Sequence, residues 1–389
     1  MIQRSSCLRS LLQSLRSGSF SDLKVGGQRR YPSMAGASLQ EQLKPSSSSE
    51  HEYANVDWDD LGFGITPADY MYSMKCSKGE NFREGLVIPF GNIELSPSAG
   101  VLNYGQGIYE GTKAYRKEDG GIILFRPDQN AIRMKIGAER MCMPCPSEDQ
   151  FITAVKQITY ANKHWVPPPG KGSLYIRPLL IGSGPVLGLA PAPEYRFLIY
   201  ASPVGNYFKE GTAPLNLYVE REFSRAVPGG CGGVKTIGNY APVLKAQMMA
   251  RKQGFSDVLY LDAVNKKNLE EVSSSNIFVV KDKIISTPVT VGTILEGVTR
   301  KSVVEIACDY GYQQVEERAI PVDDLVEADE VFCTGTAVGL APVGSITCQG
   351  KRFEFRISGE SVCNNLYTIL HGIKTGRIED KKGWIIEII

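Results

Sequence analysis

Residues 232–247 read GGVKTIGNYAPVLKAQ, which sets Lys235 in a glycine-rich turn immediately before an amphipathic helical pattern. Gly232 and Gly233 allow backbone segments to approach such a lysine closely, because glycine has no Cβ atom. A primary amine that attacks an aldehyde must be unprotonated part of the time, so burial or nearby positive charge has to lower its pKa. Most lysines are solvent-exposed. The turn around Lys235, with the acidic Glu271 further along the chain, instead suggests a lysine with a chemical role.

Five further sequence blocks accompany this stretch. They are LNYGQGIYEGTKAYR at 102–116, LFRPDQNAIRM at 124–134, YIRP at 175–178, EEVSSSNIF at 270–278 and FCTGTAVG at 332–339. Together, and in this order, the blocks resemble the branched-chain amino acid aminotransferases, most closely the plant enzymes, which are fold-type IV pyridoxal-phosphate proteins. The resemblance runs from about Tyr53 to the C-terminus, so it is far more specific than any single motif.

The resemblance implies an α/β (α+β) protein of two domains. These are a small N-terminal α/β domain and a larger C-terminal β-barrel-like domain with surrounding helices. The length agrees, because 389 residues exceed one usual hydrophobic core. We expect a transit peptide and disordered linker over residues 1–50, the small domain over 51–202, an interdomain linker over 203–212, and the pyridoxal-phosphate-binding domain over 213–389.

The charge balance argues against a nucleic-acid or membrane partner. Lys and Arg number 43, Asp and Glu number 42, and the net charge is +1, so no strongly charged surface is expected. No apolar run approaches the roughly 18 residues that a membrane-spanning helix needs. We therefore expect small-molecule substrates only.

The first 21 residues differ from the rest of the chain. They contain no acidic residue, are rich in serine, and carry Arg4, Arg9 and Arg16. Leucines at 8, 11, 12 and 15 would share one side of a helix. This composition is typical of an organelle transit peptide, and the arginine-bearing amphipathic helix favours the mitochondrial matrix, with the chloroplast as the alternative. An uncleaved disordered tail is the other reading.

Secondary structure is predicted from hydrophobic periodicity. Residues 149–164 indicate a helix that buries Phe151, Val155 and Ile158, and 297–311 indicate a helix that ends at Gly311. Residues 255–262 predict a strand, and 276–288 predict a hairpin. The helix after Asn239 would turn Leu244 and Met248 to one face, and Met248 and Met249 are interpreted as core residues.

Other motifs carry less information. The nine cysteines are expected to be reduced thiols, and Cys142 and Cys145 form a single C-x-x-C without the further ligands of a zinc site, so no metal is expected. The glycine pattern GSGPVLG at 182–188 lacks the context of a dinucleotide-binding motif. No histidine lies beside a serine or cysteine nucleophile, which disfavours hydrolase chemistry.

The resemblance implies a cofactor, pyridoxal 5'-phosphate, and assigns residues to it. Lys235 would hold the cofactor covalently and move the proton at the substrate Cα. Glu271 matches the carboxylate that keeps the pyridine nitrogen protonated. Its neighbour Glu270 is the competitor, since adjacent residues of a strand face opposite sides. Tyr240 matches the tyrosine that hydrogen-bonds the phenolic oxygen of the cofactor.

The cofactor phosphate needs fixed donors. Arg126, in LFRP, is aligned with the arginine that grips it, and a planar guanidinium suits phosphate. Val298 and Thr299, at the start of a predicted helix, resemble the pair that offers backbone N–H groups and a hydroxyl. Thr336, in TGTAVG, matches a further phosphate ligand.

One pocket must accept an aliphatic side chain in one half-reaction and the carboxylate of glutamate in the other. An apolar cavity with a cation at its rim would satisfy both. The resemblance assigns Tyr104 and Tyr109, with Tyr240, to an aromatic wall around the aliphatic side chain. Arg177, in YIRP, resembles the cation that meets the distal carboxylate together with Tyr104.

Further substrate contacts follow from the same resemblance. Tyr175 should hydrogen-bond the substrate α-carboxylate, with help from backbone N–H groups at Thr336 and Ala337. Leu189 matches an apolar residue that the neighbouring subunit supplies, which implies a homodimer.

The sequence therefore predicts a branched-chain L-amino acid aminotransferase that transfers the amine of leucine, isoleucine or valine to 2-oxoglutarate in a reversible ping-pong reaction. A D-amino acid aminotransferase or an aminodeoxychorismate lyase would share Lys235 and Glu271, although YIRP and the aromatic block fit them less well. A pyridoxal-phosphate-binding protein without turnover is the alternative from another class.

Overall fold

The computed structural model describes residues 53–205, 213–312 and 314–389. The predicted transit peptide and linker, residues 1–50, lie outside the described residues, as do residues 51 and 52 and residues 206–212 of the predicted interdomain linker. The described residues, from Tyr53 onward, belong to one compact unit. No helix in the described ranges combines the length and the apolar character that crossing a membrane requires.

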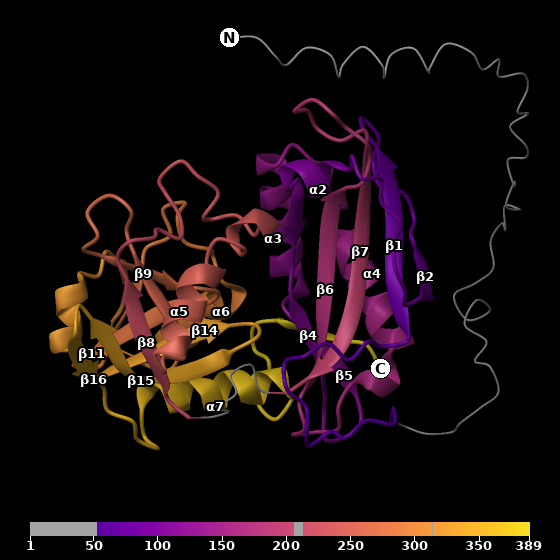
Figure 1. The fold of residues 1–389 in the computed structure, drawn as a ribbon. Coiled ribbons are helices and arrows are strands. Elements are labelled where there is room, and N and C mark those ends of the chain that lie inside the picture. The colour runs from indigo at the N-terminus through magenta and orange to yellow at the C-terminus, as the bar shows by residue number, and fades with distance from the viewer. Residues whose placement is uncertain (1–52, 206–212, 313) are drawn as a thin grey trace, which may run out of the picture. The chain divides into compact units, whose positions relative to one another are not determined.

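The first sheet is antiparallel and combines the strands of the N-terminal part of the chain with the last strand of the chain (Figure 1). Its order is β17 (Ile385–Glu387), β5 (Ile122–Phe125), β4 (Thr112–Arg116), β6 (Ser173–Gly182), β7 (Glu194–Val204), β1 (Tyr70–Ser77) and β2 (Leu86–Pro89), with β3 (Gly107–Tyr109) paired to β6. The accompanying helices are α2 (Gly100–Tyr104), α3 (Pro127–Arg140) and α4 (Glu148–Ala161). Because β17 pairs with β5, the C-terminus belongs to this sheet.

The second sheet closes on itself. Its order is β10 (Leu269–Val272), β9 (Asp257–Leu261), β8 (Leu215–Glu220), β15 (Gly339–Cys348), β14 (Glu330–Gly335), β11 (Asn276–Lys281), β12 (Ile284–Pro288) and β13 (Val315–Arg318), with β16 (Lys351–Glu354) beside β15. A further pairing between β10 and β11 completes a ring, so the expected barrel-like sheet is confirmed. Its helices are α5 (Leu244–Lys252), α6 (Val298–Asp309) and α7 (Val362–Lys374).

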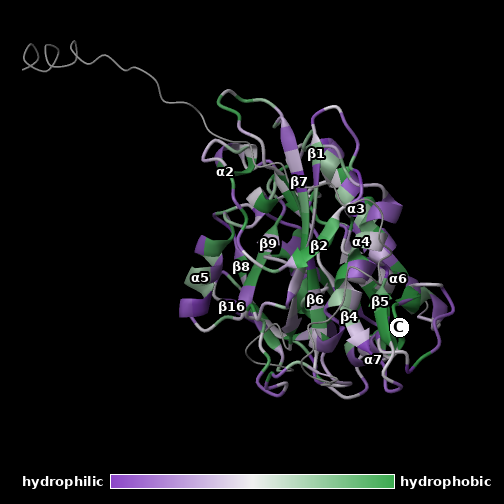
Figure 2. Ribbon diagram, turned by 90° about the vertical axis from the view of Figure 1, so that its right-hand side faces the viewer, coloured by the Kyte–Doolittle hydropathy of each residue, from purple (hydrophilic) through white to green (hydrophobic). Residues whose placement is uncertain are grey.

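The core of the first sheet follows the predicted periodicity. Phe151, Val155 and Ile158 of α4 are buried as expected. The helix begins at a capping box in which Ser147 accepts a hydrogen bond from the Gln150 N–H and Gln150 reaches back to the N–H of Ser147. All four residues of β5 are buried, and Figure 2 shows hydrophobic green on this strand.

Helix α6 occupies the predicted segment. Val303 and Ala307 are buried, and Gly311, with φ of +79°, follows the end of the helix at Asp309. At the other end, Gly297 precedes the first turn, and a Cβ atom there would lie 2.1 Å from the Asn276 side-chain oxygen. Glycine is therefore required for β11 to approach the N-terminus of α6.

Helix α5 corrects one prediction. Met248 and Met249 are 59% and 48% exposed, and Leu244 is 53% exposed, so they are not core residues. Ala246 and Ala250 are buried instead. Leu244 and Met248 are spaced i, i+4, and so are Ala246 and Ala250, so each pair lies on one face of the helix. The face with the small alanine side chains is the one that packs against β9.

The two sheets meet at the segment that carries the lysine. Thr236 forms an isolated bridge with Ile108 of β3, and the Tyr109 N–H donates to the Lys235 carbonyl over 3.1 Å. Thr236 also donates its hydroxyl proton to the Gly107 carbonyl at 3.0 Å. The lysine turn of the second sheet is thus fastened to a strand of the first.

Candidate active site

Lys235 lies among aromatic side chains. Its Nζ donates to the Tyr240 hydroxyl at 3.2 Å and lies 4.5 Å from the centre of the Tyr109 ring. The rings of Tyr109 and Tyr240 meet edge to face, with centres 5.0 Å apart. The predicted crowding by glycine holds at Gly232, where a Cβ atom would lie 2.3 Å from the Thr293 carbonyl oxygen. The amine is therefore held in place at the junction of the sheets.

A buried ion pair lies beside this amine. Glu271 is 2% exposed, and its Oε1 is 2.6 Å from Arg225 Nη1 in an ion pair. The Leu295 N–H donates to the same carboxylate oxygen at 3.0 Å. Burial raises the pKa of Glu271, and Arg225 and the Leu295 N–H oppose the rise. Glu270 is also buried, but its carboxylate accepts a hydrogen bond from the Thr293 hydroxyl at 2.6 Å.

The two tyrosines beside Lys235 differ in acidity. Burial by itself would raise the pKa of Tyr240, but the charges of Lys235 and Arg225 outweigh burial and hold that pKa below the usual value of a phenol. Burial, followed by the influence of Tyr240, raises the pKa of Tyr109. Of two adjoining phenols, the one bonded to the amine is therefore the easier to ionise.

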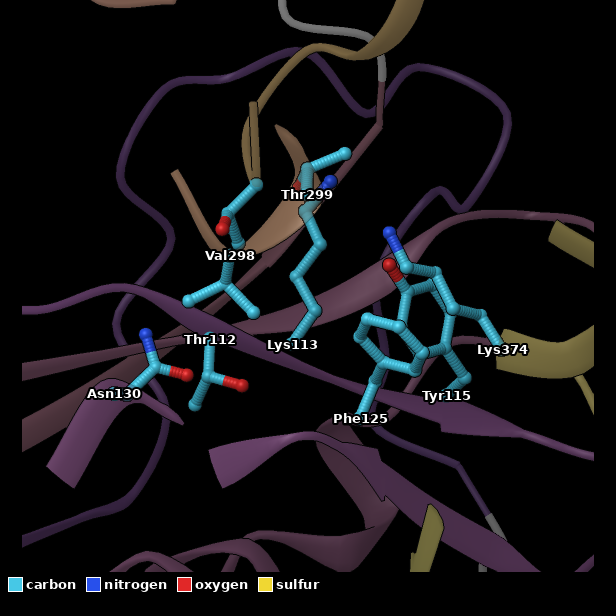
Figure 3. A pocket seen from close by; sticks show the side chains of 9 residues that line it. Thr112, Lys113, Tyr115, Phe125, Asn130, Val298, Thr299 and Lys374 are labelled. Carbon is cyan, nitrogen blue, oxygen red and sulfur yellow. The ribbon is translucent and has the colours of Figure 1, made fainter. Parts of the chain in front are cut away.

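The N-terminus of α6 opens onto a small cavity. Three predicted phosphate contacts line this cavity: Val298 and Thr299 (Figure 3), and Thr336. The first N–H groups of a helix have no partner within it and carry a partial positive charge, so they attract anions. The residues just before α6 lie near Glu271, because the Leu295 N–H donates to that carboxylate. The short segment from Leu295 to Val298 therefore connects the Glu271 carboxylate to the anion site at the start of α6.

Arg177 and Tyr175 lie on β6 and face the same aromatic group. Arg177 Nη2 donates to the Tyr175 hydroxyl at 3.2 Å, and the guanidinium lies 4.7 Å from the centre of the Tyr109 ring. Gly111 is required beside them, because a Cβ atom there would lie 2.0 Å from the Tyr175 hydroxyl. A Phe63 ring packs edge to face on Tyr175 with centres 5.2 Å apart, a contact that sequence reasoning missed.

The arrangement joins a reactive amine, a buried carboxylate and an anion site. The family model for amino-transferase class IV matches residues 107–346, which include every one of these groups and more than half of the chain. This chain is a class IV aminotransferase. Among similar proteins, a chloroplastic branched-chain-amino-acid aminotransferase of Arabidopsis thaliana is 66% identical over 92% of this chain and 93% of the relative. A mitochondrial one of Humulus lupulus is 62% identical over 100% of both chains.

Solved structures agree with the fold of the aminotransferase. The branched-chain amino acid aminotransferase of T.th., solved with pyridoxamine 5'-phosphate, has a TM-score of 0.71 and 28% identity, covering 84% of this chain and 100% of that one. The enzyme of Escherichia coli has a TM-score of 0.69 and 26% identity, covering 82% and 99%.

Arg126 of the aminotransferase does not lie where it was expected. Its guanidinium donates to Ser302 at 2.9 Å and to Glu305 at 3.0 Å, and it lies 4.4 Å from the centre of the Trp384 ring. Ser302 is one turn beyond the start of α6, and neither Arg126 nor Arg133 is among the residues that line the cavity at that start. The Arg126 guanidinium therefore contacts the side of α6 rather than its first turn, where it was predicted to lie.

Another arginine of the same sequence block lies closer to the helix entry. Arg133 on α3 donates to both carboxylate oxygens of Glu110, at 2.8 and 2.7 Å, and its Nη1 donates to the Glu296 carbonyl at 2.9 Å. Glu296 is two residues before α6. Both arginines lie within LFRPDQNAIRM, and the sequence does not distinguish them. The structure shows that Arg133 is the one that contacts the segment just before α6.

Two further predicted substrate residues are Tyr104 and Leu189, of which Leu189 was assigned to the site of the neighbouring subunit. Tyr104, on α2, is 41% exposed, and its hydroxyl donates to the Leu187 carbonyl. Leu187 and Leu189 are 90% and 85% exposed. Within this single chain, the Tyr104 hydroxyl contacts the loop at Leu187. Tyr109, in contrast, contacts Tyr240 and Arg177 beside the lysine.

Arg225 was missed by the sequence analysis. It lies in FSRAVPGG before the lysine turn, and nothing in this stretch distinguishes a buried arginine from an exposed one. Its side chain is only 2% exposed, and its guanidinium lies 5.9 Å from the centre of the Tyr240 ring. Arg225 thus connects the Glu271 carboxylate to the phenol that contacts Lys235.

Proposed function

We propose that this protein is a branched-chain L-amino acid aminotransferase that uses pyridoxal 5'-phosphate and transfers the amine of leucine, isoleucine or valine reversibly to 2-oxoglutarate. The observation that carries the proposal is the connected set of Lys235, Tyr240, Arg225 and Glu271, which leads through Leu295 to the cavity at α6. The names of the similar proteins from Arabidopsis and Humulus support the same substrate class.

The residues present fit the cofactor. Its aldehyde, phenolic oxygen, ring nitrogen and phosphate call in turn for an amine, a hydroxyl donor, a carboxylate and an anion site. The amine is that of Lys235, the hydroxyl that of Tyr240, the carboxylate that of Glu271, and the anion site is the start of α6. The contacts described above connect these groups in the same order. When bound, pyridoxal phosphate withdraws electrons from the substrate Cα and so makes its C–H bond acidic.

In the proposed mechanism the protein moves the proton of the substrate Cα and keeps Glu271 ionised. The Lys235 amine takes the proton from the substrate Cα, and the Tyr240 hydroxyl positions Nζ by the hydrogen bond between them. Glu271 must be ionised to hold the ring nitrogen in its protonated form. Arg225, 2.6 Å away, favours that ionised state against the cost of burial.

We propose that Arg133, rather than Arg126, holds the cofactor phosphate together with Val298, Thr299 and Thr336. Arg133→Gln is expected to raise the dissociation constant of pyridoxal phosphate by about tenfold or more, because charge-assisted hydrogen bonds contribute about 1.5–3 kcal/mol. Arg126→Gln should leave that constant nearly unchanged and lower the Tm instead, since it loses the contacts to Glu305 and Trp384.

Absorbance titration of the apoprotein with pyridoxal phosphate measures the effect. Glu110→Gln is the control for the broken ion pair, because Glu110 is fully buried and bonded to Arg133. Loss of cofactor from the Arg126 variant, with normal affinity in the Arg133 variant, would restore the original assignment.

We propose that Arg177 meets the distal carboxylate of glutamate, while Tyr109 and Tyr240 surround aliphatic side chains. Arg177→Met should lower kcat/KM for glutamate by about tenfold or more and affect leucine far less, because only glutamate loses a charge-assisted contact. Single-turnover measurements with each amino acid separate the two. Equal losses on both substrates would contradict one pocket with two modes of binding.

A half-reaction assay tests the function as a whole. Mixing the holoenzyme with L-leucine should convert the absorbance of the bound cofactor to that of its amine form, whereas D-alanine and aminodeoxychorismate should not. L-methionine belongs in the same series, because a methionine aminotransferase of Arabidopsis thaliana is 54% identical over 88% of this chain. Faster conversion by D-alanine than by L-leucine would refute the proposal.

We further propose that the enzyme is a homodimer in an organelle, the mitochondrial matrix, with the chloroplast as the alternative. The exposed side chains of Leu102, Tyr104, Leu187 and Leu189 provide an apolar surface for a second copy. Similar proteins are named mitochondrial or chloroplastic, which supports an organelle location. The mass of the protein purified from each organelle would identify the compartment and the length of any removed transit peptide.

A further inference from the structure

A second, larger cavity lies next to the cavity at the start of α6. Its volume is about 470 Å³. The two cavities share three lining residues, Lys113, Tyr115 and Lys374. On its own, the larger cavity reaches Ala337 and the residues that follow it, together with Trp58, Lys171 and His371. Neither lysine was given a role in the proposed transamination, although both also line the cavity at the start of α6.

The two lysines reach this place from different elements. Lys113 comes from β4, and Lys374 is the last residue of α7 (Figure 3). Lys113 Nζ donates to the Ala337 carbonyl at 3.2 Å. Lys374 is 7% exposed, and its Nζ lies 4.7 Å from the centre of the Phe125 ring. Within the described ranges neither amine pairs with a carboxylate.

The charges around the larger cavity are mostly positive. Among its lining residues, Asp59 is the only acidic one described, and it is already paired with Lys171. Arg116 donates to the carbonyls of Lys163, Val166 and Gly120, so its charge is also accommodated by the protein. In the part of the chain that the structure describes, the half-buried Lys113 and the buried Lys374 remain as cations without an anion.

Burial lowers the pKa of Lys113 to about 8, and burial followed by the charge of Lys113 lowers the pKa of Lys374 to about 7. His371 has a lowered pKa as well, from burial and then from Arg377 and both lysines. The C-terminal carbonyls of α7 favour a cation at Lys374, and the hydroxyls of Tyr115 and Tyr367 lie nearby, yet none of the carboxylates in the described part of the chain pairs with either amine. A bound anion would relieve this repulsion.

We propose that Lys113 and Lys374 form a second anion site in the larger cavity, which takes a small oxyanion, either a carboxylate or a phosphate, separately from the cofactor. The volume of about 470 Å³ accommodates such a metabolite with its first waters. The amines supply charge-assisted hydrogen bonds, and the aromatic rings exclude bulk water from them.

Calorimetric titration of the cofactor-loaded holoenzyme tests the site. Inorganic phosphate and succinate are used as separate probes, at constant ionic strength maintained with sodium chloride. At least one probe should bind with saturation, and Lys374→Met should weaken that binding by about tenfold or more. Affinity should also fall as the pH rises through about 7, where Lys374 loses its proton. The better probe identifies the class of oxyanion.

Two variants make the test specific. Lys351→Met removes a lysine that also lies over an aromatic ring, that of Phe353 at 4.8 Å, but does not line either cavity, so it should bind the probe normally. Lys374→Met should fold with an unchanged or higher Tm, because it removes a buried charge without a partner. Lys113→Met should weaken the binding independently.

Three outcomes would overturn the proposal. The first is that no probe binds the holoenzyme, which would mean that the cofactor phosphate already neutralises both lysines. The second is normal binding to Lys374→Met, and the third is equal loss in Lys351→Met. Since the readout is binding rather than turnover, each of these results is independent of the leucine half-reaction that tests the proposed function.

Discussion

Lys235→Ala is expected to abolish transamination. The rate of the leucine half-reaction should fall at least about ten-thousand-fold, because general-base catalysis alone contributes up to that factor and the covalent link to the cofactor is lost as well. Borohydride treatment in the presence of pyridoxal phosphate should increase the mass of the wild-type protein and leave the variant unchanged. Near-normal turnover in the variant would remove the mechanism.

The surroundings of Lys235 explain why no other amine substitutes for it. Its Nζ is bonded to Tyr240 and stands 4.5 Å from the Tyr109 ring centre, whereas Lys245, in the same sequence stretch, is exposed on α5. Lys245→Ala is therefore the matched control and should retain full activity. Removing the Lys235 charge should also raise the pKa of Tyr240, since that charge helps to lower it.

Sequence reasoning succeeded where a role depends on chain position. Val298 and Thr299 were predicted at a helix start, and α6 does begin at Val298, so their N–H groups follow from secondary structure alone. Hydrophobic periodicity likewise identified α4 and its buried face. Such features are local, and local patterns determine them.

It failed where a role depends on three-dimensional orientation. Arg126 and Arg133 share one block, but Arg126 precedes α3 and Arg133 lies within it, so only the folded position of α3 shows which guanidinium reaches the Glu296 carbonyl. Arg225 becomes significant only because folding brings it to Glu271. On α5 the apolar stripes at Leu244 and at Ala246 are equally periodic, and the choice depends on how closely β9 approaches.

Glu271→Gln is expected to retain the cofactor and lower kcat by about a hundredfold or more. A neutral amide cannot hold the proton on the pyridine nitrogen, and the loss of a buried charge interaction of about 3 kcal/mol corresponds to that factor. Arg225 would also lose its partner, since its guanidinium pairs with Glu271 at 2.6 Å. Cofactor absorbance gives the occupancy, so that lost binding is not mistaken for lost turnover.

Glu270→Gln is the matched control for this variant. Both carboxylates are buried on β10, but Glu270 bonds the Thr293 hydroxyl, so its amide replacement should keep most of the wild-type kcat. A larger loss in the Glu270 variant than in the Glu271 variant would mean that the wrong carboxylate was assigned.

The pH profile supplies an independent signature of Glu271. Burial raises its pKa above that of an ordinary glutamate, although Arg225 opposes the rise. The active form is the ionised one, which is present above the raised pKa and is lost as the pH falls through it. Wild-type kcat should therefore decline on acidification before an ordinary glutamate would protonate, and Glu271→Gln, already slow, should lack this decline because it has no carboxylate to titrate. A purely structural role for Glu271 would leave the acid side of both profiles the same.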